Sequence, residues 1–332
     1  MKQQSIKSAF YILFLVSCLC NNIIGQKASV TKVSRQPYYR YSLATSNSDS
    51  LIFYLSENNS NQSLPLIIYV QGSGNTSLFR KDVSGRIIPQ AGHIGLVEQL
   101  NNKARLLIVE KPGVQTFQQD DHNPEFDQRF SLDSWVKQIK NAAEYVLNNQ
   151  LANRSRVMVI GHSEGGVVSA TLSKQMNPII THTAILAGEG LSQLFSLYML
   201  ASKGQSFYQE EKDAGKRVDS LMSVWNDILR DPLSTQKKFW GFTYLRWSSM
   251  LKTSVYDELL RCKGKVLIVQ GEEDVHVTPE NAIALYAGLK SKGLDVDLNM
   301  IKDADHSFNL ISTKESLWNE VLAKCVTWFL TD

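Results

Sequence analysis

The residues best suited to chemistry lie in the segment RVMVIGHSEGGVVSA, residues 156–170. A short apolar run at 157–160 leads into G-H-S-E-G at 161–165 and then into small residues typical of a helix start. Between a strand and a helix, the pattern G-x-S-x-G lifts a serine hydroxyl out of the chain, and its glycines let the two elements pass close to the serine backbone. Ser163 is therefore a candidate nucleophile. The alternative is a glycine-rich turn that only packs against a sheet.

A serine nucleophile needs a base to take its proton and an acid to orient that base. Two later apolar runs lead into candidates. Residues 266–270 run into GEEDVHV, which contains Asp274, and residues 294–301 run into KDADHSF, which contains His306. Because the carboxyl ends of parallel strands meet at one edge of a sheet, Ser163, Asp274 and His306 are expected to converge there.

Other carboxylates compete with Asp274 for the acid role. Glu272 and Glu273 directly precede it, and Glu189 follows another strand-like run at 182–186. Asp274 fits the pattern G-x-x-D-x-x-V and is the preferred candidate.

Three further histidines are weaker candidates for the base than His306. His276 is a rival base, but it lies only two residues from Asp274, too close to face it easily across a cleft. We expect His162 to pack beside the serine turn and His122, in a polar loop, to be solvated.

Short strand-like runs alternate with helical stretches through most of the chain. The strands are expected at 38–43, 51–55, 66–70, 106–110, 157–160, 182–186, 266–270 and 294–301. Most of these runs are apolar throughout, which is typical of strands buried on both faces. Amphipathic helices are expected at 133–147, at 279–290 after the N-cap Thr278, and at the end of the chain. The pattern predicts an α/β protein with a mostly parallel sheet flanked by helices.

One long segment, residues 188–264, breaks this alternation because it contains no strand-like run. It carries two helical apolar stripes and an aromatic cluster, FWGF at 239–242 with Trp247. A connection of this length inside a compact domain is usually a functional insertion. We interpret it as a helical cap over the site; the alternative is a helical pair that extends the core.

The order Ser, Asp, His in the settings GHSEG, GEEDVHV and DADHSF resembles the α/β-hydrolase superfamily. The resemblance runs from about Tyr38 to the end, with the insertion where that family often places its cap, before the strand that carries the acid. It implies an α/β-hydrolase fold with its core at 27–187 and 265–332. It also implies that Ser163 is the nucleophile, His306 the general base and acid, and Asp274 the orienting carboxylate. Asp305 departs from many relatives, which have glycine there.

The same resemblance implies an oxyanion hole, whose donors stabilise the developing charge in acyl transfer. Relatives carry H-G-x-G where this chain has Q-G-S-G at 71–74, so the hole is assigned to the backbone N–H groups of Ser73 and Glu164. Gln71 replaces the usual histidine. The turn lacks the third glycine of a dinucleotide fingerprint and the G-K-[ST] of a P-loop, so no cofactor is expected.

These features predict a serine hydrolase that cleaves a carboxylic ester through an acyl-enzyme. A peptidase of the aminopeptidase or prolyl oligopeptidase kind, or a thioesterase, is the alternative with the same chemistry. Aminopeptidase relatives hold a free amine with cap carboxylates, a role open to Glu210, Glu211 and Asp213. A non-catalytic binding protein that uses the pocket under the cap is the third interpretation.

Composition excludes some functions and bears on the location of the protein. The net charge of +3 over 332 residues, without a basic run interleaved with aromatics, argues against nucleic-acid binding. An apolar run at 9–19, flanked by Lys2 and Lys7, predicts an export signal over residues 1–25. Two cleavage sites are open within it. LVSC resembles a lipobox, which would end the leader at Ser17 and leave a lipidated Cys18 as the only membrane attachment, whereas the small Gly25 offers an ordinary cut before Gln26.

Two cysteines remain outside this leader. Cys262 and Cys325 are either one disulfide or two thiols. No Cys/His cluster has the spacing of metal ligands.

Overall fold

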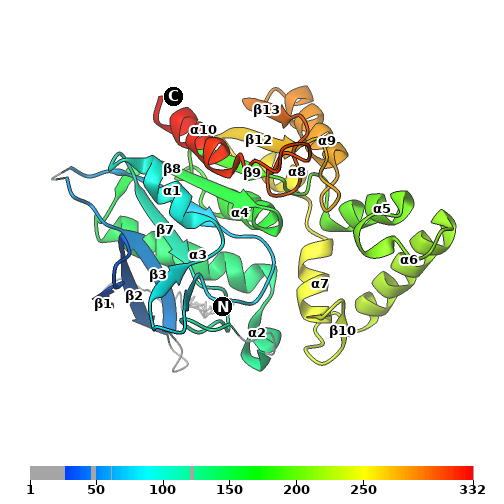
Figure 1. Ribbon diagram of the computed structural model, residues 1–332, viewed down its shortest axis with the longest axis horizontal. Helices are drawn as coiled ribbons and strands as arrows, with labels where there is room; N and C mark the ends of the chain where they lie inside the picture. Colours follow the sequence, from blue (N-terminus) through cyan, green and yellow to red (C-terminus); the bar gives the residue numbers. More distant parts are fainter. Residues whose placement is uncertain (1–26, 46–49, 61, 120–122, 332) are drawn as a thin grey trace, which may run out of the picture.

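The computed structural model describes residues 27–45, 50–60, 62–119 and 123–331. In these ranges nine strands form one twisted sheet in the order β1-β2-β3-β7-β4-β8-β9-β12-β13 (Figure 1). The strands are β1 (Ser29–Lys32), β2 (Tyr38–Ala44), β3 (Ser50–Ser56), β4 (Pro65–Val70), β7 (Arg105–Val109), β8 (Asn153–His162), β9 (His182–Leu186), β12 (Lys265–Gly271) and β13 (Val296–Ile301). The first three pair antiparallel, β3 pairs antiparallel with β7, and from β7 to β13 all neighbours are parallel.

Helices cover both faces of the sheet. They are α1 (His93–Leu100), α2 (Pro124–Arg129), α3 (Leu132–Asn148), α4 (Glu164–Gln175), α8 (Val255–Leu259), α9 (Pro279–Ser291) and α10 (Trp318–Thr331). Alternate residues of β4 enter two different cores: Ile68 belongs to the core covered by α3, α4, α8 and α9, whereas Ile67 belongs to the core covered by α1 and α10. This alternation follows from the two-residue period of a strand. It explains why the run at 66–70 is apolar throughout.

The predicted fold class is confirmed, and each predicted strand of the core is present. The structure also contains three features that the sequence pattern does not predict: β1, α1 and the small hairpin formed by β5 (Phe79–Lys81) and β6 (Ile87–Pro89). Helix α1 starts after Gly92, which has a positive φ of 75° and makes no side-chain capping bond. Because the usual N-cap signal is missing, the start of this helix is hard to recognise. The predicted leader and His122 lie outside the described residues.

Residues 188–264 form a largely helical insertion between β9 and β12. It contains α5 (Gln193–Lys203), the short helix η1 (Ser206–Tyr208), α6 (Ala214–Arg230), the strands β10 (Lys238–Phe239) and β11 (Phe242–Thr243), α7 (Tyr244–Leu251) and α8. Helices α5, α6 and α7 lie to one side of the sheet (Figure 1) and bury a core of their own. The aromatic rings of the insertion pack on one another; the ring centroids of Phe239 and Trp240, for example, are 4.1 Å apart.

Candidate active site

Ser163 sits in a strained turn between β8 and α4. Its φ of 55° and ψ of −126° lie outside the regions that L residues ordinarily adopt. Two hydrogen bonds hold the turn: the Ser163 N–H donates to the Leu186 carbonyl at 2.9 Å, and the Ser163 carbonyl accepts from Gly166 N–H at 2.8 Å. The neighbouring strand β9 and the first turn of α4 therefore fix the serine backbone.

The two glycines of the turn leave no room for a side chain. A Cβ at Gly161 would lie 2.1 Å from the Gly165 carbonyl oxygen, and a Cβ at Gly165 would lie 2.4 Å from the Val70 carbonyl oxygen. Backbone therefore meets backbone at both positions, as the G-x-S-x-G pattern requires.

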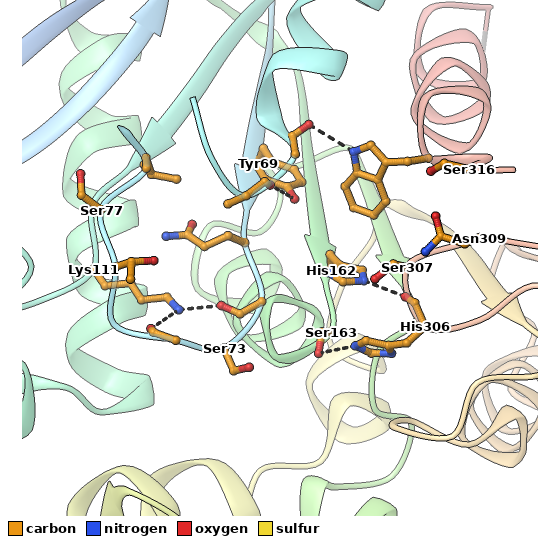
Figure 2. A pocket seen from close by; sticks show the side chains of 18 residues that line it. Tyr69, Ser73, Ser77, Lys111, His162, Ser163, His306, Ser307, Asn309 and Ser316 are labelled. Carbon is orange, nitrogen blue, oxygen red and sulfur yellow. Dashed lines mark hydrogen bonds between the residues drawn. The ribbon is translucent and has the colours of Figure 1, made fainter. Parts of the chain in front are cut away.

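The three side chains predicted for catalysis form one hydrogen-bonded chain. His306 Nε2 lies 3.0 Å from Ser163 Oγ, and His306 Nδ1 lies 2.8 Å from Asp274 Oδ2 (Figure 2 shows the Ser163–His306 bond). Because an ionised carboxylate only accepts hydrogen bonds, Nδ1 carries the proton and Nε2 is free to accept the serine proton. This is the geometry in which a histidine can activate a serine.

Asp274 is held by donors on both carboxylate oxygens. Its Oδ1 accepts from the backbone N–H groups of His276 at 2.8 Å and Val277 at 2.9 Å, and its Oδ2 also accepts from Gln270 Nε2 at 2.9 Å. The rival base His276 therefore supports the acid with its backbone, while its own ring is exposed.

The rival acids lie elsewhere. Glu272 and Glu273 are exposed. Glu189 is buried and accepts from Gln193 Nε2 at 3.2 Å, and burial raises its pKa.

His162 packs beside the serine turn, where it contacts the catalytic candidate His306. Its Nε2 donates to the His306 carbonyl at 3.0 Å, and its ring meets Trp318 edge to face at 5.0 Å. Burial and the neighbouring His306 lower the pKa of His162 to about 4, so the ring is neutral at pH 7. It therefore anchors the loop that carries His306.

The loop after β4 carries Ser73 beside the candidate nucleophile Ser163. A Cβ on Gly72 would lie 3.2 Å from Ser163 Cβ, so the loop backbone passes close to the serine. Within the described residues, the N–H groups of Ser73 and Glu164 donate to no other group. Both predicted oxyanion donors are thus free, and Glu164 N–H lies at the positive end of α4.

Two charged residues missed by the sequence reading, Glu110 and Lys111, hold this loop from the end of β7. Lys111 Nζ donates to the carbonyls of Gly72 at 2.6 Å and Gly74 at 2.8 Å (Figure 2). The Glu110 carboxylate accepts from Ser77 Oγ at 2.6 Å. The sequence does contain a signal for them, because Glu110 and Lys111 form a charged pair at the carboxyl end of the apolar run that becomes β7.

A third missed residue, Arg246 of α7, reaches the nucleophile turn from the insertion. Its guanidinium forms an ion pair with the carboxylate of Glu164, and both side chains are buried. Nothing in the local sequence around Arg246 indicates this contact.

A cavity of about 520 Å³ opens beside Ser163 and His306. Figure 2 shows Ser73, Tyr69 and Asn309 in its wall. Trp318 also lines it. Gln71 also lines it; this side chain is buried, and its Nε2 has no partner among the described residues. No aspartate or glutamate belongs to the described lining.

The residues considered for binding a free amine lie away from this cavity. Glu210, Glu211 and Asp213 are exposed, and Asp213 accepts from the Lys216 N–H at 2.9 Å as the N-cap of α6. None of the three lines the cavity, and neither do the aromatic rings of the insertion.

The remaining sequence features concern the cysteines, metal binding and membrane-spanning helices. Cys262 and Cys325 are both free thiols. In the part of the chain that the structure describes, no cluster of His, Cys, Asp or Glu suits a metal ion, and none of the helices there has the length and apolar character to span a membrane.

Comparison with known proteins gives a family match over part of the chain and fold matches over nearly all of it. Residues 218–331 match the model of the Prolyl oligopeptidase family; this range contains Asp274 and His306 but begins after Ser163. A puromycin-hydrolyzing peptidase from Mycobacterium tuberculosis superposes with a TM-score of 0.59 at 13% identity, covering 92% of this chain and 39% of that one.

Two further structures show the same fold. Est1E from Butyrivibrio proteoclasticus gives a TM-score of 0.55 at 15% identity, covering 90% of this chain and 100% of that one. The acylaminoacyl peptidase of Pyrococcus horikoshii gives 0.56 at 14% identity, covering 92% of this chain and 41% of that one. The chain thus spans less than half of the two peptidases and the full length of Est1E.

Proposed function

We propose that this chain, which belongs to the α/β-hydrolase superfamily, is a serine hydrolase that cleaves a carboxylic ester through an acyl-enzyme. The observation that carries the proposal is the chain of hydrogen bonds from Ser163 through His306 to Asp274. This chain of hydrogen bonds ends at the Ser163 hydroxyl beside a cavity that Ser73 also lines, and Glu164 directly follows Ser163. Nucleophile, base, orienting acid and oxyanion donors are thus all within one site.

In this mechanism the Ser163 oxygen attacks the ester carbonyl while its proton passes to His306 Nε2. The developing oxyanion binds the N–H groups of Ser73 and Glu164, each worth roughly 3–4 kcal/mol of barrier by analogy with measured oxyanion donors. His306 then protonates the leaving alcohol and later removes a proton from the water that hydrolyses the acyl-enzyme. Asp274 stabilises the imidazolium in both steps.

The polarity of the cavity favours a neutral substrate over one with a free amine. Its described lining carries hydroxyl and amide groups, including Ser307, Asn309 and Ser316, and no carboxylate. Lys111 is the one lysine or arginine in this lining, and two carbonyls engage its ammonium. An α-ammonium group would therefore lack the anionic partner that aminopeptidase relatives provide.

A peptidase is the second candidate, because residues 218–331 match the Prolyl oligopeptidase family and two of the structural neighbours are named as peptidases. The sequence similarity of these neighbours supports the fold alone. Ester and amide cleavage share the same acyl-enzyme, so the site geometry fits either bond. The lack of a carboxylate in the described cavity lining favours the ester over a substrate with a free amine.

The test uses a fluorophosphonate probe and short-chain p-nitrophenyl esters, with amino-acid anilides in parallel. Labelling and ester turnover are expected in the wild type and lost in Ser163→Ala. They should persist in Ser291→Ala, an exposed serine at the end of α9 that serves as the matched control. Faster turnover of anilides than of esters would move the assignment to a peptidase. A folded wild type that neither labels nor hydrolyses would contradict the proposal.

We propose further that the 188–264 insertion acts as a cap and that the protein is exported. The contact of Arg246 with Glu164 supports the role as a cap, since it brings α7 to the turn that carries Ser163. A cap predicts that bulky fluorophosphonates label Ser163 more slowly than small ones. The apolar run at 9–19 supports the second; cell fractionation, together with lipid labelling of wild type and Cys18→Ala, tests export and anchoring.

A further inference from the structure

Lys111 is a buried ammonium group dedicated to the loop that carries Ser73. It directly follows β7, and its residue is 2% exposed. Its Nζ donates to the carbonyls of Gly72 and Gly74, the two residues on either side of Ser73. Figure 2 shows both bonds running from Lys111 into this loop, with Ser73 at its tip.

The surroundings of Lys111 show that it is not half of a structural ion pair. Among the described residues no carboxylate lies within ion-pair distance of its ammonium. Instead the ammonium lies 4.5 Å from the Trp135 ring centroid and 5.6 Å from that of Phe130, where cation–π attraction offsets part of its lost hydration. Burying a charge this way costs free energy, and the two loop carbonyls are the hydrogen-bond partners that it gains.

The bond to Gly72 acts on the predicted oxyanion donor itself. The Gly72 carbonyl and the Ser73 N–H belong to the same planar peptide group. A cation bound to the carbonyl oxygen draws electron density away from the nitrogen, so the N–H becomes a stronger donor. Linked hydrogen bonds reinforce one another by about 10–30% each. The second bond, to Gly74, holds the far side of the turn, where a φ of 107° leaves only glycine unstrained.

We propose that Lys111 is a positioning residue for the oxyanion hole, which orients and polarises the Gly72–Ser73 peptide so that its N–H meets the developing oxyanion. This inference rests on the proposed hydrolase function. Lys111 acts through the peptide and does not itself contact the reacting atoms.

The charge of Lys111 should respond to mild alkali. Burial lowers the pKa of Lys111 to about 8. The charged groups facing it are Glu164 of α4, which raises this pKa, Arg246 of α7, which lowers it, and the adjacent Glu110, which raises it. Deprotonation removes the positive charge from the Gly72 carbonyl, so the oxyanion donor weakens as the pH rises through this value.

The kinetic test compares Lys111→Met, Lys111→Arg and the control Lys137→Met, which removes an exposed lysine of α3. For Lys111→Met we expect kcat on a p-nitrophenyl ester to fall about 10²-fold with KM little changed, because the loss is confined to oxyanion stabilisation. Lys111→Arg keeps a cation and should recover part of the rate. The wild-type rate should decline above pH 8, and this decline should be absent in both Lys111 variants, since guanidinium and methionine do not titrate there.

A structural measurement makes the proposal independent of finding the right substrate. The carbonyl ¹³C shifts of Gly72 and Gly74 should titrate together with a midpoint near the Lys111 pKa in Ser163→Ala, and should stop titrating when Lys111→Met is added. If the shifts behave this way but no ester is hydrolysed, the hydrolase function fails and the support of the loop stands. If the two carbonyl shifts do not titrate, or titrate equally without Lys111, the positioning role is overturned. It is also overturned if Lys111→Met keeps the wild-type kcat.

Discussion

The guanidinium of Arg246 donates to the carboxylate of Glu164, the residue directly after Ser163. The side chains are 3% and 2% exposed, and the guanidinium lies 3.8 Å from the ring centroid of Trp247. Since the Glu164 N–H is a predicted oxyanion donor, this pair connects the insertion to the site. A buried cation thus supports each of the two donor residues, Lys111 through a backbone carbonyl and Arg246 through a carboxylate.

Removing Arg246 should be costly because it leaves the Glu164 carboxylate buried without a partner. We expect Arg246→Met to lower the free energy of unfolding by about 3–5 kcal/mol. The double variant Arg246→Met/Glu164→Gln should lose less of this free energy than the single variant, because it no longer buries an unpaired carboxylate. Urea unfolding of the wild type, both variants and Arg230→Met measures this; the exposed Arg230–Asp227 pair should be worth under about 1 kcal/mol. Equal losses in the single and double variants would contradict the account.

Replacing Asp274, the proposed orienting acid, should abolish most activity with little change in the fold. Asp274→Asn keeps the shape of the side chain but no longer stabilises a protonated His306, and its amide can force the wrong tautomer on the ring. By analogy with serine proteases we expect kcat to fall roughly 10⁴-fold. Glu273→Gln, at an exposed neighbour, should retain the wild-type rate. Steady-state ester kinetics measures both, and a greater loss in Glu273→Gln would move the acid role to that residue.

The sequence was sufficient to predict the core of the fold because the buried strands are apolar on both faces. The run at 66–70 is typical of a covered strand in a sheet, and the runs at 157–160, 266–270 and 294–301 lead into the three residues predicted for catalysis. Parallel strands then brought Ser163, Asp274 and His306 to one edge without any knowledge of the loops. Such contacts depend on topology, which periodicity and turn signals reveal.

The supporting charges could not be predicted in the same way. Arg246 meets Glu164 across 82 positions of sequence, and its partner depends on how α7 packs against the core. Lys111 looks like an ordinary loop lysine until the path of the loop at 71–78 is known. The lining of the cavity likewise could not be predicted from the aromatic residues of the insertion, because their rings pack on one another and do not line it.

The glycines of the nucleophile turn should differ sharply in their tolerance of alanine. A Cβ at Gly165 would lie 2.4 Å from the backbone oxygen of Val70, whereas at Gly166 the nearest atom is a methyl carbon of Ile185 at 3.1 Å. Gly165→Ala must displace β4 or α4, so we expect a loss of at least about 3 kcal/mol, the upper range for overpacking. In Gly166→Ala the helix propensity gain of about 1 kcal/mol should offset the tight methyl contact. Thermal unfolding of the two variants tests this, and similar stabilities would contradict it.

Glu110 should make the protein less stable as the pH rises toward neutrality. Burial raises the pKa of Glu110 from 4.5 to about 7, although hydrogen bonds from Ser77, Leu78 and Tyr54 oppose this. The folded state therefore holds the proton more tightly than the unfolded state. Its stabilising contribution is complete below pH 4.5 and is lost as the pH rises to about 7, with a total change on the order of 3 kcal/mol.

The variant Glu110→Gln isolates this effect, because its side chain does not titrate. Burial lowers the pKa of both His93 and His162 to about 4, so these histidines act in the opposite direction: they cost stability as the pH falls from 6.5 toward 4. Both are present in wild type and variant, and their contributions cancel in the difference. We expect the free energy of unfolding of the wild type, relative to Glu110→Gln, to decrease steadily between pH 4.5 and 7 in urea titrations. A difference that does not change with pH would show that Glu110 stays ionised in the folded protein, held by its three donors against the cost of burial.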